Sequence, residues 1–236
     1  MLYAILNNEK IPATPKALAK CPLCQMEVFS KCGEINIWHW SHKKHESCDN
    51  WYEPETQWHL NWKEVFGKDR TEIVIIKDGI KHFADIQSEN YVIIELQNSP
   101  LKNNAIRQRE EFYGERMLWV INGTSFIFNF RMYEDSFLKD WMRFQDGYVN
   151  LKTGEFQSNI VIKRNIKFEW SYARKSWQDA NRPIFIDFGG DSIFRVLKGM
   201  GTSSGIGIKV KKSSFVQKYK GDLSKLHLIT DLNKKP

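Results

Sequence analysis

The side chains best suited to chemistry lie on two neighbouring stretches with strand character. Asp85 falls within Ile80–Ser88, while Glu95 and Gln97 belong to the run that begins at Tyr91. The two residues between these stretches suffice for a tight turn, and residues two apart on a strand share a face. A buried acid needs a partner, and carboxylate oxygens suit Mg²⁺ or Mn²⁺. The pattern predicts a divalent-metal site that hydrolyses phosphodiesters, against the alternative of solvated, inert carboxylates.

The four cysteines of the chain share one window with three histidines: Cys21, Cys24, Cys32, Cys48, His39, His42 and His45. A C-P-L-C knuckle near histidines is typical of zinc binding in a cytosolic chain. Structural zinc takes four nitrogen or sulfur ligands, and a hairpin across the linking segment would bring the ends of the window together, as in a zinc ribbon. We expect Zn²⁺ on the two knuckle cysteines, His42 and Cys48, with His39 as the alternative histidine and Cys32 left over. A buried or redox C-x-x-C is the competing interpretation.

A helix is predicted over Glu53–Phe66, with Pro54 in its first turn. An apolar stripe at helical spacing indicates its buried face: Trp58, Trp62, Val65 and Phe66. Beside that stripe Glu55, His59 and Lys63 follow at intervals of four. This polar row either faces the predicted site or forms a solvated salt-bridge row.

The elements after this helix have a regular order. A strand at Glu72–Lys77 precedes the two strands that carry the acids, and a helix is predicted over Leu101–Tyr113 with Ser99 as its N-cap. A buried strand at Arg116–Ile121 follows, which implies a right-handed parallel crossover. The resulting α/β order is αβββαβ, and we expect a closing helix at Phe137–Phe144.

Charge is distributed unevenly along the 236 residues. The net charge is +7 overall, −3 over residues 1–150 and +10 over residues 151–236. A basic segment joined to an acid-bearing one suits an enzyme that acts on a polyanion, although a basic surface also serves solubility. The start of the chain lacks the pattern of a signal peptide, and no apolar run is long enough to span a membrane, so we expect a cytoplasmic protein.

The C-terminal part is predicted to be mainly β, with a short helix at Ala173–Ala180. The predicted strands are Asn159–Ile166, Ile184–Phe188, Ser192–Leu197 and Gly207–Lys211. Basic residues, including Lys163, Arg164, Lys175 and Lys211, alternate with Trp170, Tyr172 and Trp177. Stacking aromatics with phosphate contacts hold single strands, so we expect a DNA-holding module, unless these aromatics form its core.

In this order the motifs resemble the competence protein CoiA-like family within the PD-(D/E)xK nuclease superfamily, from about Cys21 to Gly123. The shared pattern is a knuckle, H-x-x-H with a later cysteine, E-x-x-x-H-x-x-x-K, D, E-x-Q-x-S, and R-x-x-x-Y before a W-x-I strand. The residues that match it are Cys21, Cys24, His39, His42, Cys48, Glu55, His59, Lys63, Asp85, Glu95, Gln97, Ser99, Arg109, Tyr113 and Trp119.

The resemblance implies a restriction-endonuclease-like αβββαβ core and a DNA-processing role, in competence, recombination or defence against foreign DNA. It implies catalytic positions at Glu55, His59, Lys63, Asp85, Glu95 and Gln97, of which Glu55, Asp85 and Glu95 would bind Mg²⁺ or Mn²⁺. Gln97 stands where the superfamily usually has lysine, and a glutamine orients water only through hydrogen bonds. Lys63 is then the best source of positive charge, with Lys102 or the metal itself as substitutes.

DNA contacts are expected from Arg109, Tyr113, Lys102, Lys175 and Lys211, with a structural tie as the equal alternative for Arg109 and Tyr113. The expected organisation is a zinc-ribbon-like segment at 1–50, a nuclease-like domain at 51–148 and a basic β-rich module at 149–236. Two further interpretations stay open, a nuclease fold that binds DNA or recombination partners without cutting, and a zinc-ribbon interaction protein.

Overall fold

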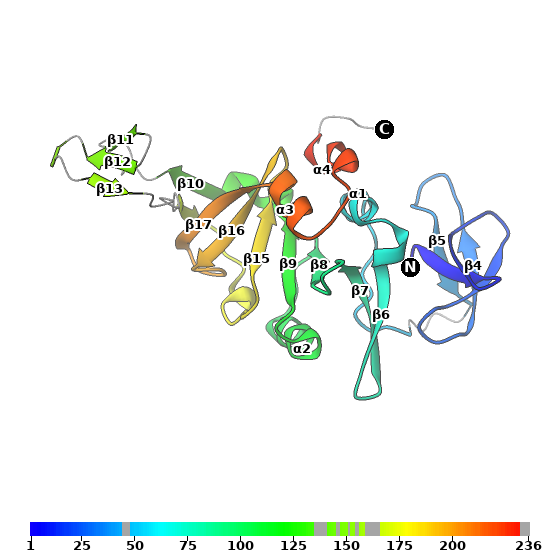
Figure 1. Ribbon diagram of the computed structural model, residues 1–236. Coiled ribbons are helices and arrows are strands. Elements are labelled where there is room, and N and C mark those ends of the chain that lie inside the picture. Colours follow the sequence, from blue (N-terminus) through cyan, green and yellow to red (C-terminus); the bar gives the residue numbers. More distant parts are fainter. Residues whose placement is uncertain are drawn as a thin grey trace.

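The computed structural model describes residues 1–43, 48–134, 141–144, 147–150, 152–153, 156–158 and 166–231. In these residues a long mixed sheet carries helices on both faces, and a smaller sheet near the N-terminus adjoins one of its ends (Figure 1). His45, Lys163, Arg164 and nearly all of the strand predicted at Asn159–Ile166 lie outside the described residues.

The N-terminal sheet is antiparallel, with the strand order β2-β1-β3-β4-β5 in the described part of the chain. Its strands are β1 (Tyr3–Leu6), β2 (Glu9–Pro12), β3 (Leu18–Lys20), β4 (Glu27–Lys31) and β5 (His39–His42). The hairpin expected across the cysteine window is present as β4 and β5, in which Val28 lies opposite His42. The strands before Cys21 had no counterpart in the sequence prediction.

The next unit has the predicted αβββαβ order of elements. Its elements are α1 (Gln57–Phe66), the 3-10 turn η1 (Lys68–Arg70), β6 (Thr71–Lys77), β7 (Ile80–Gln87), β8 (Ile93–Gln97), α2 (Asn103–Tyr113) and β9 (Met117–Asn122). The strands β8 and β9 pair in parallel, with Glu95 opposite Trp119. The α2 helix ends at Gly114, whose φ of 75° lies in the left-handed region that favours glycine.

Both helices begin later than the sequence predicted. Thr56 is extended at φ −114°, and its N–H donates to Nδ1 of His59, so α1 begins after Thr56 rather than at Glu53. Glu55 therefore precedes the helix instead of lying on it. Ser99 does not cap α2, because its hydroxyl donates to Glu53 and Lys102 takes the N-cap position.

The large sheet continues beyond β9 into the C-terminal part of the chain. Its order in the described residues is β10-β14-β17-β16-β15-β9-β8-β7-β6, and β15 pairs in parallel with β9. The sheet thus crosses the boundary predicted between residues 148 and 149. The added elements are η2 (Thr124–Asn129), β10 (Phe130–Glu134), β14 (Ile166–Trp170), η4 (Lys175–Trp177), β15 (Ile184–Asp187), β16 (Ser192–Lys198), β17 (Ser204–Lys211), α3 (Lys212–Lys218), η5 (Leu223–Lys225) and α4 (His227–Thr230).

The helix predicted at Phe137–Phe144 is wrong over Trp141–Phe144, which form the strand β11, and residues 137–140 lie outside the described part. Strands β11, β12 (Gly147–Asn150) and β13 (Phe156–Ser158) form a separate antiparallel sheet. Aromatic residues favour strands when a hairpin partner follows, and β12 supplies that partner. No helix in the described residues is long and apolar enough to cross a membrane.

Two apolar cores cover the faces of the large sheet. On one face α1, α3 and α4 pack through Trp62, Phe215 and Ile229, and on the other α2 and η4 pack through Ile106 and Trp177. Trp170 and Trp177 are 1% and 0% exposed, so these two aromatics belong to the core, the alternative that the sequence left open, and cannot stack on a DNA strand. Tyr172 remains exposed.

Candidate functional site

A cluster of three cysteines and one histidine lies at the edge of the N-terminal sheet. One ligand atom from each of Cys21, Cys24, His42 and Cys48 lies within 4.8 Å of all the others. The Sγ atoms of Cys21 and Cys48 are 3.6 Å apart, and Sγ of Cys24 is 3.2 Å from Nε2 of His42. These four residues are the predicted zinc ligands, and we call them the Cys₃His cluster.

The chemistry of this cluster fits a soft divalent metal. Three sulfurs and one imidazole nitrogen form a common structural zinc set. The hydrogen bond between the Cys21 and Cys48 thiols lowers the pKa of Cys21 to about 5 and raises the pKa of Cys48, so the pair shares one proton and one of the two sulfurs is the thiolate that a metal requires. Nδ1 of His39 instead lies 2.8 Å from the Ile37 carbonyl oxygen, so His42 completes the group. The cluster can therefore bind a metal such as zinc.

The predicted acids meet where β7 and β8 separate. Ladder pairing between these strands covers Ile86 opposite Ile94 and Gln87 opposite Ile93. Beyond it, side chains bridge the gap: the Asp85 N–H donates to Oε1 of Glu95 at 3.3 Å, and the Leu96 N–H donates to Oδ2 of Asp85 at 2.9 Å. The two carboxylates are therefore fixed beside one another by backbone donors.

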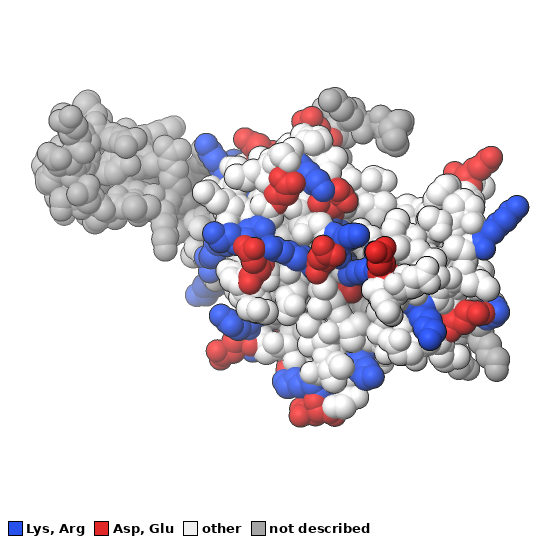
Figure 2. Space-filling view, turned by 45° about the vertical axis from the view of Figure 1, so that its right-hand side comes forward, with Lys and Arg blue, Asp and Glu red and all other residues white. Residues whose placement is uncertain are grey.

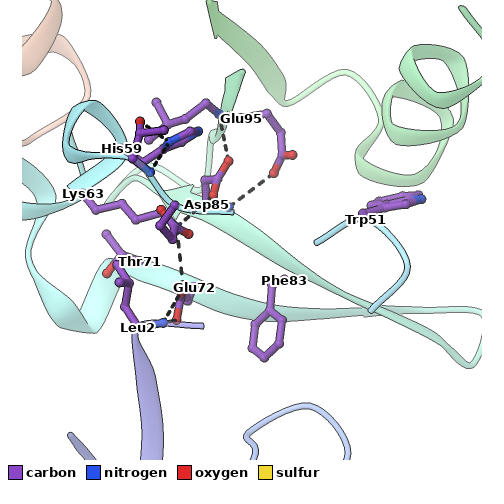
Figure 3. A network of polar contacts seen from close by, with 12 residues as sticks. Leu2, Trp51, His59, Lys63, Thr71, Glu72, Phe83, Asp85 and Glu95 are labelled. Carbon is purple, nitrogen blue, oxygen red and sulfur yellow. Dashed lines mark hydrogen bonds and ion pairs between the residues drawn. The ribbon is translucent and has the colours of Figure 1, made fainter. Parts of the chain in front are cut away.

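Lys63 lies at the centre of the acidic side chains and is 2% exposed. Its Nζ is 2.5 Å from Oε1 of Glu55 and 3.0 Å from Oδ1 of Asp85. A third carboxylate, that of Glu72, is 3.6 Å away. In Figure 3, His59 and Lys63 extend from α1 toward Asp85, and the Glu72 carboxylate meets the backbone of Leu2.

A buried ion pair on the far side of α1 holds this helix, and hence Lys63, against the sheet. The indole N–H groups of Trp58 and Trp62 both donate to Oδ2 of Asp187, at 3.0 and 2.9 Å. Oδ1 of Asp187 lies 2.7 Å from Nζ of Lys212, which is fully buried. Because every partner in this group is satisfied, it anchors α1 and carries no free chemistry.

The surroundings divide the protons unequally between the acids. Burial would raise the pKa of Asp85, but the Lys63 ammonium, His59 and the hydrogen bonds from Leu96 and Lys63 together hold that pKa below its ordinary value. Burial and the neighbouring Asp85 raise the pKa of Glu95 to about 8 despite the Arg109 guanidinium. Burial also raises the pKa of Glu55, whose Oε2 is buried without a hydrogen-bond partner.

Gln97 is buried and hydrogen-bonded within the protein. Its amide nitrogen donates to both carboxylate oxygens of Glu53, at 3.1 and 3.0 Å, and to the Ser99 carbonyl oxygen at 2.8 Å. Its Oε1 accepts from Nη1 of Arg109 at 3.4 Å. The amide N–H groups of Gln97 are thus used within the protein, which leaves its oxygen as the atom that could accept a further hydrogen bond from a water molecule.

Arg109 and Tyr113 make interior contacts, which agree with the structural tie that the sequence left open beside a DNA contact. Arg109 is 6% exposed, lies 3.5 Å from Oε2 of Glu95 and donates to the Trp51 carbonyl oxygen at 2.9 Å. The Tyr113 hydroxyl donates to the Phe83 carbonyl oxygen at 3.0 Å. The other three expected contacts, Lys102, Lys175 and Lys211, are exposed but lie on α2, η4 and β17, away from the pocket that the acids line.

A solvent-accessible pocket joins these groups, and we call it the carboxylate pocket. Six acids line it, Asp49, Glu53, Glu55, Glu72, Asp85 and Glu95, together with His59, Lys63 and Arg109. Lys63 and Arg109 balance only part of this negative charge. Apart from the Cys₃His cluster, the described residues hold no group of three ligands already at metal-binding spacing.

Sequence reasoning missed Glu53 and Glu72. Glu72 is 6% exposed, has a left-handed φ of 47°, and accepts from the backbone N–H groups of Leu2 and Tyr3. It therefore ties the N-terminal sheet to the pocket. Neither acid stands in a recognisable motif: Glu72 begins a strand, and Glu53 precedes a proline. Only the folded contacts reveal them.

Residues 8–50 match the sequence model of the family described as "Competence protein CoiA, N-terminal domain". The matched segment includes the Cys₃His cluster and the hairpin that positions it. Searches of curated proteins and of solved structures gave no match. The N-terminal segment is thus similar to the CoiA family, whereas the carboxylate pocket is formed mostly by residues beyond the matched range.

Proposed function

We propose that this chain is a divalent-metal-dependent nuclease of the CoiA type, acting on DNA with the carboxylate pocket as its active site. The observation that carries the proposal is the juxtaposition of Asp85 and Glu95 where β7 and β8 separate, within an αβββαβ unit. The match of residues 8–50 to the CoiA N-terminal family supports it independently. The PD-(D/E)xK likeness rests on the motif order together with this arrangement of elements.

The residues of the pocket fit a hard cation such as Mg²⁺ or Mn²⁺. Oxygen ligands are available from Asp85 and Glu95, and Oε2 of Glu55 is a buried acceptor without a partner. The excess of acids over cations in the pocket favours a further positive charge. A bound ion would acidify a water molecule and stabilise the charge on a phosphate.

The chain's own residues have distinct roles in this proposal. Asp85 and Glu95 would hold the cation, and Glu55, whose Oε1 now contacts Lys63, would supplement them. Lys63 is the buried cation nearest to Asp85, so it replaces the missing superfamily lysine as the group that polarises water. Gln97 keeps Glu53 and Arg109 in place, and Arg109 in turn orients Glu95. His59 lines the pocket and lowers the pKa of Asp85.

One observation favours a second function, DNA binding without cleavage. The Lys63 ammonium already lies between Glu55 and Asp85, where it neutralises both carboxylates without any metal. A nuclease fold that has lost its metal would be stabilised in this way. The two functions differ in whether Mg²⁺ or Mn²⁺ displaces these contacts.

A cleavage assay separates the two functions. The full chain is incubated with linear, circular, single-stranded and branched DNA, and with RNA, across a titration of Mg²⁺ and Mn²⁺. Cleavage that requires the metal and falls at least about 1,000-fold in Asp85→Asn supports the nuclease. Exposed Asp69→Asn is the matched control. Undiminished cleavage by Asp85→Asn would overturn the assignment of the site.

A further inference from the structure

A second groove opens in the large sheet, outside the carboxylate pocket. Strands β15 and β16 pair from Ile184 opposite Val196 to Ile186 opposite Phe194. Before Ile184 and after Val196 the two chain segments separate, and the pairing of β16 with β17 shifts register between Val196 and Lys198. The separation leaves a groove of about 900 Å³, which we call the β15–β16 groove. Its size falls within the range of ligand sites, roughly 300–1,000 Å³.

Three cations line this groove, and no carboxylate does. Arg182, Arg195 and Lys198 contribute to its walls, and none of them forms an ion pair with an acid in the described residues. Nε of Arg182 is buried without a hydrogen-bond partner. The floor is apolar and includes Ile184 and Met200. The Arg195 guanidinium lies over the Phe185 ring, 5.9 Å from its centroid, so Arg182 and Lys198 are the cations beside this floor. Unpaired cations beside an apolar floor suit a ligand with anionic groups and a flat or aliphatic body.

The walls of the groove are fixed without a ligand. The buried carboxylate of Glu110 accepts from the backbone N–H groups of Asn181 and Arg182, at 2.8 and 3.2 Å, and so holds one wall. On the other wall Gly199 has a φ of +88°, and an added Cβ would lie 2.4 Å from the Ser204 carbonyl oxygen. The Thr202 hydroxyl lies 2.7 Å from that oxygen and from the Gly199 carbonyl oxygen. A rigid groove loses little entropy on binding.

We propose that the β15–β16 groove binds a nucleic-acid strand through its phosphates. The groove opens at Ile184, which lies opposite Trp119 of β9, and Trp119 lies opposite Glu95 of β8. Two strand spacings, about 10 Å, thus separate Ile184 from Glu95 within the sheet, with the fully buried Trp119 between them. Because the ligand is the expected nuclease substrate, the inference rests on the proposed function.

The arrangement of surface charge favours a local groove over a broad basic face. On the face shown in Figure 2, acidic and basic side chains are interspersed over the surface. A nucleic acid therefore meets no continuous positive surface on that face, so its phosphates would be bound by local groups of unpaired cations. The β15–β16 groove is such a group.

The test measures strand binding by the full, zinc-loaded chain in buffer without added magnesium or manganese, so that cleavage does not interfere. The double variant Arg182→Gln, Lys198→Gln should bind a labelled single-stranded oligonucleotide about tenfold more weakly. Its log affinity should also depend less steeply on log salt, by about 1.4 for two lost contacts. Lys68→Gln with Lys218→Gln removes the same charge at two exposed positions outside the groove.

The proposal would be overturned if the variant Arg182→Gln, Lys198→Gln bound the oligonucleotide with wild-type affinity. It would also be overturned if the control variant Lys68→Gln, Lys218→Gln lost as much affinity. Competition by deoxyadenosine monophosphate in the wild type but not in the variant would support a site for one nucleotide unit. If deoxyadenosine monophosphate does not compete, but the groove variant still loses affinity for the oligonucleotide, the groove binds a continuous strand rather than a single nucleotide. Asp85→Asn separates the two proposals: normal cleavage by it removes the proposed active site and leaves the groove result standing.

Discussion

The Cys₃His cluster and the carboxylate pocket balance their charge in opposite ways. The four ligand atoms of the cluster already lie within 4.8 Å of one another, and no lysine or arginine stands among them. In the pocket Lys63 separates Glu55 from Asp85, and Arg109 accompanies Glu95. The cluster can therefore bind a metal such as zinc with no protein cation among its ligands, whereas under the proposed function a metal in the pocket would have to displace contacts of Lys63 and Arg109. We infer a permanent structural ion in the first and an exchangeable ion in the second.

The two regions are also physically joined. Asp49 directly follows the cluster ligand Cys48 and binds Nδ1 of His82 and the N–H of Phe83 at 2.9 and 2.8 Å. Trp51 stacks on His82 at 3.3 Å between ring centroids, and its carbonyl oxygen accepts from Arg109. A short run of chain therefore leads from the cluster to the residue that orients Glu95.

The largest expected effect is loss of the metal in the cluster. Cys48→Ser should reduce bound zinc from about one ion per chain to almost none, because structural sites need all four ligands. Zinc contributes about 10–16 kcal/mol in small zinc-folded peptides, so we expect the sheet of residues 1–50 to unfold. Metal analysis and hydrogen exchange measure both changes.

Cys32→Ser is the matched control for that substitution, since Cys32 lies in the same sheet but outside the cluster. It should keep its zinc and its protected amides. Equal zinc content in Cys48→Ser and Cys32→Ser would contradict the division into a permanent and an exchangeable site.

The next effect concerns the cation that holds the pocket together. Lys63→Met leaves Glu55, Glu72 and Asp85 without their shared ammonium, and removing one partner of a buried ion pair costs about 3–5 kcal/mol. Added Mn²⁺ should restore part of that stability, because it supplies the missing charge. Thermal unfolding with and without Mn²⁺ tests this, with exposed Lys68→Met as control. A loss that Mn²⁺ leaves unchanged argues against cation exchange.

A smaller effect follows from the proton on Glu95. Its pKa of about 8 lies above the ordinary value of 4.5, so the metal-free fold loses stability as the pH rises through this window and the buried carboxyl ionises. A bound cation replaces the proton, so metal affinity should rise by about tenfold per pH unit up to pH 8 and then level off. Mn²⁺ titrations from pH 6 to 9 measure this slope. Glu95→Gln should flatten it, and a flat wild-type profile would refute the account.

The smallest effect distinguishes a structural tie from a DNA contact. Tyr113→Phe removes the hydrogen bond to the Phe83 carbonyl oxygen and should cost about 0.5–1.5 kcal/mol. DNA affinity should stay at the wild-type value, because the hydroxyl is used inside the protein. Exposed Tyr91→Phe is the control and should change neither quantity. Weaker DNA binding at unchanged stability would restore Tyr113 as a DNA contact.

The parts of the site that the sequence predicted are those with local spacing. The C-x-x-C knuckle and hairpin placed Cys21, Cys24, His42 and Cys48, and strand alternation placed Asp85 and Glu95 in neighbouring strands. Such patterns report periods of a few residues. The starts of both helices were predicted less well. The Thr56 N–H donates to the imidazole of His59, which sets the start of α1, and the Ser99 hydroxyl donates to the carboxylate of Glu53 instead of capping α2.

The remaining features depend on contacts between distant residues. Glu72 meets the backbone of Leu2, 70 residues away, and β15 joins β9 to extend one sheet across the predicted boundary. The hydrogen bond from the Gln97 amide to the Glu53 carboxylate joins residues 44 positions apart in the sequence. No local pattern encodes these pairings, so the occupied amide N–H groups of Gln97 and the anchoring role of Asp187 appear only in the folded chain.

The most direct test of the account is a Mn²⁺ titration of the zinc-loaded protein without DNA, followed by electron paramagnetic resonance. The account predicts about one Mn²⁺ site beyond the zinc, competed by Mg²⁺. This site should weaken at least about 100-fold in Asp85→Asn and persist in exposed Asp69→Asn. Equal Mn²⁺ binding by the wild type and Asp85→Asn would contradict the claim that the carboxylate pocket exchanges its protein cation for a metal.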